Sequence, residues 1–202
     1  MVDQSKKPDS PTVIPEGIDG PFATARRVIL REIEALLRCI REDQTDRFID
    51  ELTEADRIFV VGAGRSKLAV DAFAMRLMHL GLTAHVAADT TTPAIGDGDL
   101  LIACSGSGET PTVVHLTRAA AQAGARVVAV VGAPESTLET HADVTVHLRE
   151  YSEDYEPQAS SQFVGTLFEQ GAFVFFDCLV QVVQKIRDVD PDAMFARHAN
   201  LE

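Results

Sequence analysis

The sequence predicts a single α/β domain, a three-layer αβα sandwich around a five-stranded parallel sheet. Five short segments rich in valine, isoleucine or leucine predict the strands, at residues 57–64, 83–89, 99–106, 126–133 and 143–148. The first, third and fourth are continuous apolar runs, as expected of strands buried on both faces. Helix-length segments between the strands supply the crossovers that parallel strands require. A length of 202 residues suits one such domain.

Two of these crossovers have clear ends. Residues 66–80 and 110–123 carry helical patterns, and each is followed by a glycine, Gly81 or Gly124, where helices commonly end. In a parallel sheet of this kind, ligands bind beyond the carboxyl ends of the strands. The loops that follow the strands are therefore where a binding site is expected.

Two further helices are expected to flank the sheet. From residue 22 to 52, apolar residues recur every three or four positions among charges, which predicts one amphipathic helix. Residues 162–189 are apolar on nearly every side and predict a helix that is buried all round. One domain cannot easily bury both, so we expect a subunit interface, most simply in a symmetric dimer or tetramer. Residues 1–20 are polar and rich in proline and glycine, which predicts a flexible arm before a domain at 21–202.

Composition argues against several classes of partner. The net charge of −13 would repel a nucleic-acid backbone. No stretch approaches the ~18 uninterrupted apolar residues of a membrane span, and the N-terminal segment lacks the charged-then-apolar pattern of a secretory signal. The widely spaced Cys39, Cys104 and Cys178 form no metal-ligand pattern. We therefore expect no nucleic acid and no membrane as partners, and buried thiols in a reducing cytoplasm.

Two glycine-rich loops end predicted strands, GAGRS at 62–66 and SGSGET at 105–110, and a helix follows each at once. Backbone N–H groups and the positive end of a helix dipole then face the same point, which suits a phosphate. The dipole contributes only ~0.3–1 kcal/mol, whereas hydrogen bonds to a charged group contribute ~1.5–3 kcal/mol each. Hydroxyl groups must therefore add to the binding. The candidates are Ser66, Ser105, Ser107 and Thr110.

Each loop alone could be an ordinary turn, but two at adjacent strand ends favour binding. Gly62 and Gly64 also begin a dinucleotide fingerprint, yet Lys67 stands where its third glycine belongs, although Asp89 lies near the usual distance for a ribose-binding acid. SGSGET lacks the lysine of a P-loop and the G-x-S-x-G pattern of a nucleophile elbow. We therefore interpret these serines as ligand-binding groups and not as nucleophiles.

Five ionisable residues have more than one possible role. Glu169 follows two apolar residues in the first turns of the last helix, and partial burial would make it a usable base near neutrality, although it could instead complement the helix N-terminus. His79 lies at a predicted helix end, where a core or dipole-stabilised imidazole is common, and His198 would ordinarily belong to the C-terminal tail. The sequence leaves Glu169, His79 and His198 all open as the base. Arg65 and Arg76 could be surface cations or could contact an anion.

The order of these motifs resembles the sugar-isomerase (SIS) domain family, and within it the 6-phospho-3-hexuloisomerases. The segments are GAGRS, FAMRLMHLG, DTTTPAI, SGSGET, QFVGTLFEQ and MFARHANLE, and the likeness covers nearly everything from residue 22 onward. The resemblance implies a flavodoxin-like sheet and isomerisation of arabino-3-hexulose 6-phosphate to fructose 6-phosphate in the ribulose monophosphate pathway. It also implies no metal or organic cofactor, and a cytoplasmic tetramer with active sites between subunits.

The resemblance also implies roles for individual residues. Glu169, in the family's G-[ST]-x-FE motif, would be the base, and His79 would reach the site from a neighbouring chain. Phe163 and Val164 stand where the family has Pro-Met, so the loop before Glu169 departs from the pattern. The phosphate would be held by the loop hydroxyls, with two more residues of the first loop among the binding groups: Gly64, Arg65, Ser66, Ser105, Ser107 and Thr110.

This chemistry agrees with the residue types found. Moving the carbonyl from C3 to C2 needs a base that takes the C2 proton and returns it at C3 through an enediol. The developing oxyanion needs a hydrogen-bond donor, for which His79, the loop amides and Arg65 are candidates. Two alternatives remain open from the sequence: an isomerase of another sugar phosphate, and a non-catalytic phosphosugar-binding module.

Overall fold

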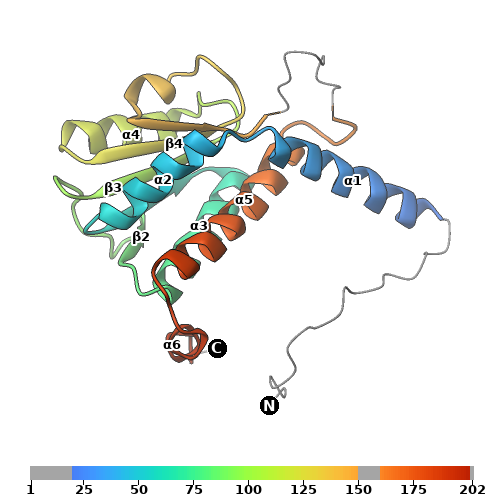
Figure 1. The fold of residues 1–202 in the computed structure, drawn as a ribbon. Coiled ribbons are helices and arrows are strands. Elements are labelled where there is room, and N and C mark those ends of the chain that lie inside the picture. The colour runs from blue at the N-terminus through green and yellow to red at the C-terminus, as the bar shows by residue number, and fades with distance from the viewer. Residues whose placement is uncertain (1–19, 150–159, 201–202) are drawn as a thin grey trace.

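A computed structural model describes residues 20–149 and 160–200 and has one five-stranded, fully parallel sheet (Figure 1). The strand order is β2-β1-β3-β4-β5. Val60 pairs with Ile102, which in turn pairs with Val128, so the three central strands run in register. Every strand lies within a segment predicted from the sequence, and the predicted sheet is confirmed. The strands are β1 (Ile58–Gly62), β2 (Ala84–Val86), β3 (Leu100–Ser105), β4 (Arg126–Val131) and β5 (Val144–His147).

Alternate residues of the central strands face two separate cores, which gives the three layers. Val60 and Ile102 face one core, whereas Phe59 and Leu101 face the other. Because both sets are apolar, the strands read as continuous hydrophobic runs. The first core is covered by α2 (Glu42–Glu54), α3 (Gly64–His79) and α5 (Thr166–Ile186), and the second by α4 (Pro111–Gln122) with the short 3-10 helix η1 (Glu139–His141).

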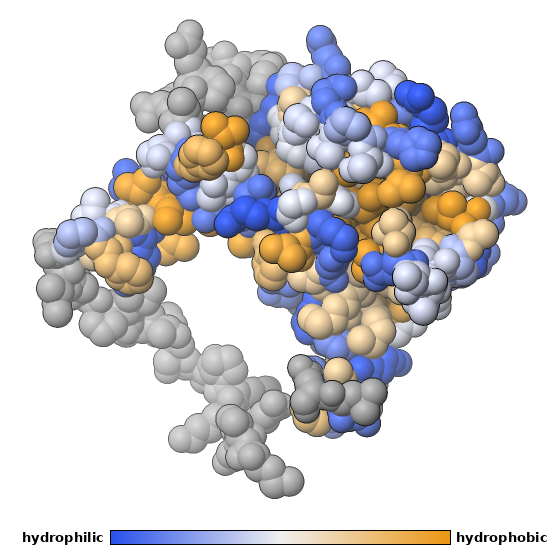
Figure 2. Space-filling view, turned by 180° about the vertical axis from the view of Figure 1, so that it is seen from behind, coloured by the Kyte–Doolittle hydropathy of each residue, from blue (hydrophilic) through white to orange (hydrophobic). Residues whose placement is uncertain are grey.

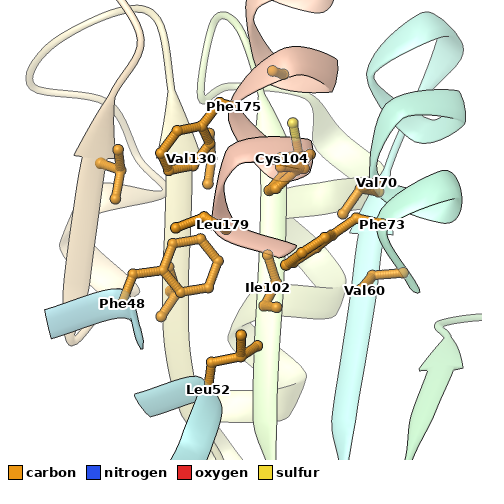
Figure 3. Packing of buried hydrophobic residues seen from close by; sticks show 14 of the residues in the cluster. Phe48, Leu52, Val60, Val70, Phe73, Ile102, Cys104, Val130, Phe175 and Leu179 are labelled. Atoms are coloured by element: carbon orange, nitrogen blue, oxygen red, sulfur yellow. The ribbon is translucent and has the colours of Figure 1, made fainter. Parts of the chain in front are cut away.

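Aromatic side chains fill the larger core between the sheet and its three helices (Figure 3). Phe48 of α2, Phe73 of α3 and Phe175 of α5 are each no more than 3% exposed. Phe73 also stacks on Phe176, with ring centroids 4.6 Å apart. Burial of each such ring stabilises the fold by about 1.5–3 kcal/mol. This packing fixes α3 and α5 side by side over the middle of the sheet.

The prediction of a single helix over residues 22–52 is wrong, because this region forms two helices, α1 (Pro21–Arg38) and α2. Arg41 is extended, with ψ 128°, and its guanidinium binds the Asp43 carboxylate through two hydrogen bonds of 2.9 Å. The break lets α2 lie on the sheet while α1 packs against α5. No glycine or proline lies at the break between α1 and α2, and the apolar periodicity of the sequence continues on both sides of it.

Helix α1 extends away from the rest of the described chain, and Figure 2 shows apolar residues along it. Phe22 and Leu30 are 81% and 58% exposed, whereas only Ala23 and Leu36 are buried. The apolar face predicted for this helix is therefore largely uncovered in a single chain. The arm predicted for residues 1–20 lies outside the described residues except for Gly20.

The last predicted helix is shorter than residues 162–189, since α5 ends at Ile186 and a separate helix, α6 (Pro191–Ala196), follows. Asp188 has φ 49°, a left-handed conformation that stops α5, and Asp190 caps α6 by accepting the Asp192 N–H at 2.9 Å. One face of α5 is buried, but the helix is not buried all round. Its exposed apolar residues are Phe173, Val174, Val182 and Ile186.

By length and hydropathy α5 could cross a membrane, but 44% of its most apolar window is buried inside the molecule, as in the core helix of a globular domain. The expectation of three buried thiols is partly wrong. Cys104 is buried at the end of β3, Cys39 is half-buried, and Cys178 is exposed because it lies on the outward side of α5.

Candidate functional site

The two glycine-rich loops lie side by side, because they follow neighbouring parallel strands. Gly62 at the end of β1 pairs with Cys104, one residue before the end of β3. Helix α3 begins within the first loop at Gly64, and α4 begins just after the second at Pro111. The first N–H groups of α3, and those of α4 that follow Pro111, which has none, therefore have no intrahelical acceptor and lie at the same edge of the sheet.

The first loop, 62–66, turns tightly into α3. A Cβ on Gly62 would lie 2.9 Å from the backbone N and Cα of Lys67, so a larger residue would push the helix away from the strand. Gly64 has φ 56°, a conformation that glycine adopts readily. Ser66 is only 8% exposed, whereas Arg65 is exposed at the rim.

The second loop, 105–110, is organised by its own hydroxyl groups. Ser105 is buried, and its Oγ lies 2.9 Å from Thr110 Oγ1 and accepts the Gly108 N–H at 3.2 Å. Ser107 is exposed, and its Oγ accepts the Glu109 N–H at 3.2 Å. The Ser107 O–H proton therefore remains available to donate to a ligand, whereas Ser105 shapes the loop.

A neighbouring segment after β4 holds this second loop from outside. The Glu109 carboxylate accepts the Thr137 N–H at 2.5 Å and the Thr137 hydroxyl at 2.7 Å, and these two bonds lower the pKa of Glu109. Gly108 has φ 64°, and a Cβ there would lie 2.3 Å from the Ser136 side chain. The loop is thus fixed before any ligand arrives.

Glu169 lies in the first turn of α5 and forms an ion pair with Arg65 of the first loop, with Nε and Oε2 2.5 Å apart. The Glu169 side chain is 19% exposed, and that of Arg65 is 60% exposed. Burial and, secondarily, the charge of Glu169 raise the pKa of the Cys104 thiol to about 12. The carboxylate therefore lies near the ends of both β1 and β3.

Phe168 fixes the start of α5 against the loops. Its ring lies 3.1 Å from where a Cβ would be on Gly106, and equally close to that position on Gly132. The Gly106 carbonyl accepts the N–H groups of Gly132 and Ala133 at 3.0 and 2.9 Å. Only residues without a side chain leave room for this ring, so the start of α5, the second loop and the turn after β4 at Gly132 form one packed unit.

His79 lies at the opposite end of α3 from this unit. The helix has 16 residues, so its two ends are about 22 Å apart. His79 is 4% exposed and stacks on His198 with centroids 5.5 Å apart. Its pKa is lowered by burial and, to a smaller extent, by the charges of Arg76 and His198. Arg197 donates to the His79 carbonyl at 3.1 Å.

Within one chain, the structure brings most of the sequence-predicted site residues together but leaves His79 apart. Those at the shared edge of β1 and β3 are Gly64, Arg65, Ser66, Ser105, Ser107, Thr110 and Glu169. His198, which the sequence alone placed in the tail, contacts His79 instead. Among residues 20–149 and 160–200, no three His, Cys, Asp or Glu side chains are grouped closely enough to hold a metal ion.

One residue near the site is not evident from the sequence. Glu32 of α1 accepts hydrogen bonds from Ser160, Ser161 and Gln162, in the segment that leads to Glu169. These residues are about 130 positions away in the chain, and no local motif joins them to Glu32.

Comparison with known proteins places the chain in a family. A model of the SIS domain matches residues 51–169. A 3-hexulose-6-phosphate isomerase of Mycobacterium gastri is 45% identical over 75% of this chain and 77% of its own length. Another from Bacillus subtilis is 35% identical over 86% of this chain and 95% of its own length.

Among solved structures, a Methanococcus jannaschii protein whose crystal structure is described as inferring the function of 3-hexulose-6-phosphate isomerase is similar, with a TM-score of 0.77 and 32% identity. The match covers 89% of this chain and 99% of that one. The family match, the two relatives and the shared fold all agree with the geometry of the loops. The chain therefore belongs to the SIS domain family.

Proposed function

We propose that the protein is a 3-hexulose-6-phosphate isomerase, the activity of the 6-phospho-3-hexuloisomerases, and interconverts arabino-3-hexulose 6-phosphate and fructose 6-phosphate. The observation that carries this proposal is the Glu169 carboxylate beside two loops suited to phosphate, together with relatives of that name over most of the chain. We further propose a cytoplasmic enzyme of the ribulose monophosphate pathway that acts without a metal or organic cofactor.

Glu169 is the proposed base. It takes the proton from C2, so the C3 carbonyl oxygen becomes an enediolate oxygen. A proton then moves from the C2 hydroxyl to the C3 oxygen, and the carboxyl returns its proton at C3 as the carbonyl forms at C2. Arg65, 2.5 Å from the carboxylate through its Nε, keeps the base oriented and has further N–H groups for the enediolate oxygen. The carbon-bound proton is thus carried by one carboxyl group, and the hydroxyl proton moves between the two substrate oxygens.

The phosphate group is proposed to bind across the two loops. Ser107 has an exposed hydroxyl, Ser66 lies in the first turn of α3, and Thr110 is the N-cap residue of α4. The free N–H groups at the start of both helices add donors. Because Ser105 and Glu109 already order the second loop, little conformational entropy is lost on binding. Binding away from the reacting carbons orients C2 and C3 toward Glu169.

His79 is proposed to complete the site of an adjacent protomer in a tetramer. It lies about 22 Å along α3 from the loops of its own chain, and α5 exposes an apolar stripe that association would cover. Its lowered pKa keeps the imidazole neutral at pH 7, so it can donate a proton in a hydrogen bond to the oxyanion.

The direct test is turnover. Purified protein is mixed with arabino-3-hexulose 6-phosphate, and fructose 6-phosphate is followed by a coupled assay, with ribose and heptulose phosphates as competing substrates. Clear preference for the 3-hexulose is expected. Binding of the sugar phosphate without any turnover would identify a non-catalytic module, and preference for another sugar would reassign the substrate.

A mixing experiment tests the contribution of a second subunit. Glu169→Gln and His79→Ala chains, each nearly inactive alone, are unfolded together and refolded as mixed oligomers. If each site takes Glu169 from one chain and His79 from another, part of the mixed sites contains both residues and activity returns. No recovery above the sum of the separate variants would exclude a shared site.

A further inference from the structure

Glu32 connects α1 to the segment that precedes Glu169. Its Oε1 accepts the Ser161 N–H at 3.0 Å and the Ser161 hydroxyl at 2.7 Å. Its Oε2 accepts the Ser160 hydroxyl at 2.8 Å and Gln162 Nε2 at 2.9 Å. Ser160 Oγ in turn accepts the Gln162 N–H at 3.1 Å. One carboxylate thus holds three consecutive residues, with two donors on each oxygen.

Glu32 is charged when it does so. Burial alone would raise its pKa, but the hydrogen bonds from Gln162, Ser161 and Ser160 outweigh burial and lower the pKa to about 2. Hydrogen bonds to a charged acceptor are roughly twice as strong as neutral ones. Four such bonds therefore tie α1 to residues 160–162.

The same face of α1 also contacts α5 on the other side of Glu169. Leu36 is one helical turn after Glu32 and is buried, and its Cδ2 lies 2.6 Å from where a Cβ would be on Gly171. Gly171 is two residues after Glu169. The two contacts from α1 therefore enclose the first turn of α5, one before the carboxylate and one after it.

Residues 163–165, directly after the Glu32 contacts, have little other support. Phe163 and Val164 are each 87% exposed, and Gly165 is left-handed with φ 82°. Thr166 N–H donates to the Phe163 carbonyl at 3.0 Å, and Glu169 N–H donates to the Gly165 carbonyl at 3.1 Å. Residues 163–165, between the Glu32 contacts and the start of α5, therefore contribute no buried side chain, and the first buried one is Phe168, directly before Glu169.

We propose that Glu32 is a positioning residue for Glu169, acting by holding residues 160–162 so that the first turn of α5 presents its carboxylate beside Arg65. This inference rests on the proposed function for its effect on turnover, but its effect on the segment does not depend on any activity. Glu32 touches no reacting atom. When the Glu32 side chain is removed, the Glu169 carboxylate is still present but no longer correctly placed.

The test compares Glu32→Ala and Glu32→Gln with Glu34→Ala in the full-length protein. Glu34 is two residues further along the same helix. Its side chain is 63% exposed and, within the described part of the chain, forms an ion pair with Arg38 of the same helix at 2.6 Å. Amide hydrogen exchange is measured in the peptides that cover residues 160–170 and, as a reference, in β3. Turnover of the 3-hexulose phosphate is measured in parallel.

In Glu32→Ala, exchange in residues 160–170 should rise at least about tenfold while β3 stays protected. The kcat should fall about ten- to hundredfold, as expected for a base displaced by about 1 Å, and KM should change less than about threefold because the phosphate loops are untouched. Glu32→Gln keeps the shape of the side chain but presents an N–H₂ group to two donors. Its exchange rates and kcat should therefore lie between those of Glu32→Ala and those of the unaltered protein. Glu34→Ala should match the unaltered protein.

Unchanged exchange in residues 160–170 would overturn the proposal whatever the kinetics. Raised exchange with unchanged kcat would show that Glu32 orders the segment without positioning the base, which also overturns it. If the unaltered protein itself shows no turnover, the proposed function fails separately, and so does the positioning role, while the exchange data still decide whether Glu32 orders the segment.

Discussion

Replacing Glu169 by Gln should remove turnover while leaving the fold and substrate binding almost unchanged. The amide is nearly the same size, and its oxygen can still accept the Arg65 Nε–H that the carboxylate accepts at 2.5 Å. What the variant lacks is a group that can take and return a proton. General-base catalysis contributes typically 10²–10⁴-fold, or about 3–5 kcal/mol of barrier, so kcat should fall by that factor.

The cost in stability is expected to be small. The Glu169 and Arg65 side chains are 19% and 60% exposed, so their ion pair resembles a surface pair worth about 0–1 kcal/mol. For a chain of this size, 1 kcal/mol corresponds to about 2–4 °C in Tm. The melting temperature should therefore fall by no more than about 4 °C, and KM should stay within about threefold.

The measurement is steady-state formation of fructose 6-phosphate, with thermal unfolding of the same samples. Asp50→Asn, at an exposed position on α2, serves as the control for loss of one carboxylate elsewhere. If Glu169→Gln keeps kcat within about threefold of the unaltered enzyme, Glu169 is not the base and the reasoning from its position is refuted. A fall in kcat accompanied by loss of the folded oligomer would assign it a structural role.

Three further outcomes follow from the geometry of the loops and of α1. Gly108→Ala places a Cβ 2.3 Å from the Ser136 side chain at φ 64°, so it should cost about 1–3 kcal/mol of stability by thermal unfolding. Gly96→Ala, with nothing within 4 Å of its Cβ position, is the control, and equal Tm values for the two would contradict the strain argument. Ser107→Ala removes one exposed donor, so KM should rise about tenfold with kcat nearly constant; an unaltered KM would argue against phosphate contact. Because the folded pKa of Glu32 is about 2 against an ordinary 4.5, its contribution to the free energy of unfolding is full above about pH 5 and is lost as pH falls toward 2. The difference in urea unfolding between the unaltered protein and Glu32→Gln should therefore shrink between about pH 6 and pH 3, and a constant difference would count against the ionised carboxylate.

The sheet could be predicted because buried parallel strands leave a simple local signal. Val60 and Ile102 face one core and Phe59 and Leu101 the other, so residues 58–61 of β1 and 100–104 of β3 are all apolar. The break between α1 and α2 left no such signal. It depends on where α2 packs relative to the sheet, and the extended Arg41 that makes it is stabilised by a neighbour, Asp43, that would suit a helix equally well.

The residues of the candidate site also differ in how well the sequence alone indicates them. Ser105, Ser107 and Glu169 lie in local motifs whose residue types indicate their chemistry, so the sequence alone could single them out as candidates. Glu32 is one acidic residue among several in an amphipathic helix, and only the fold brings it to Ser161, which is 129 positions away. Likewise, the sequence alone did not show that His198 stacks on His79, because that contact depends on how α6 returns along α3.

The ring of Phe168, seated against Gly106 and Gly132, has a consequence for protein engineering. Exchanging α5 between relatives would fail if either recipient position carried a side chain, since the ring would then have no room. The smallest unit that can be transferred is therefore the start of α5 together with the turns at Gly106 and Gly132. These are three segments separated in sequence. Libraries that aim to change substrate choice should keep these three pieces constant and vary the exposed Ser107 and Arg65 around them.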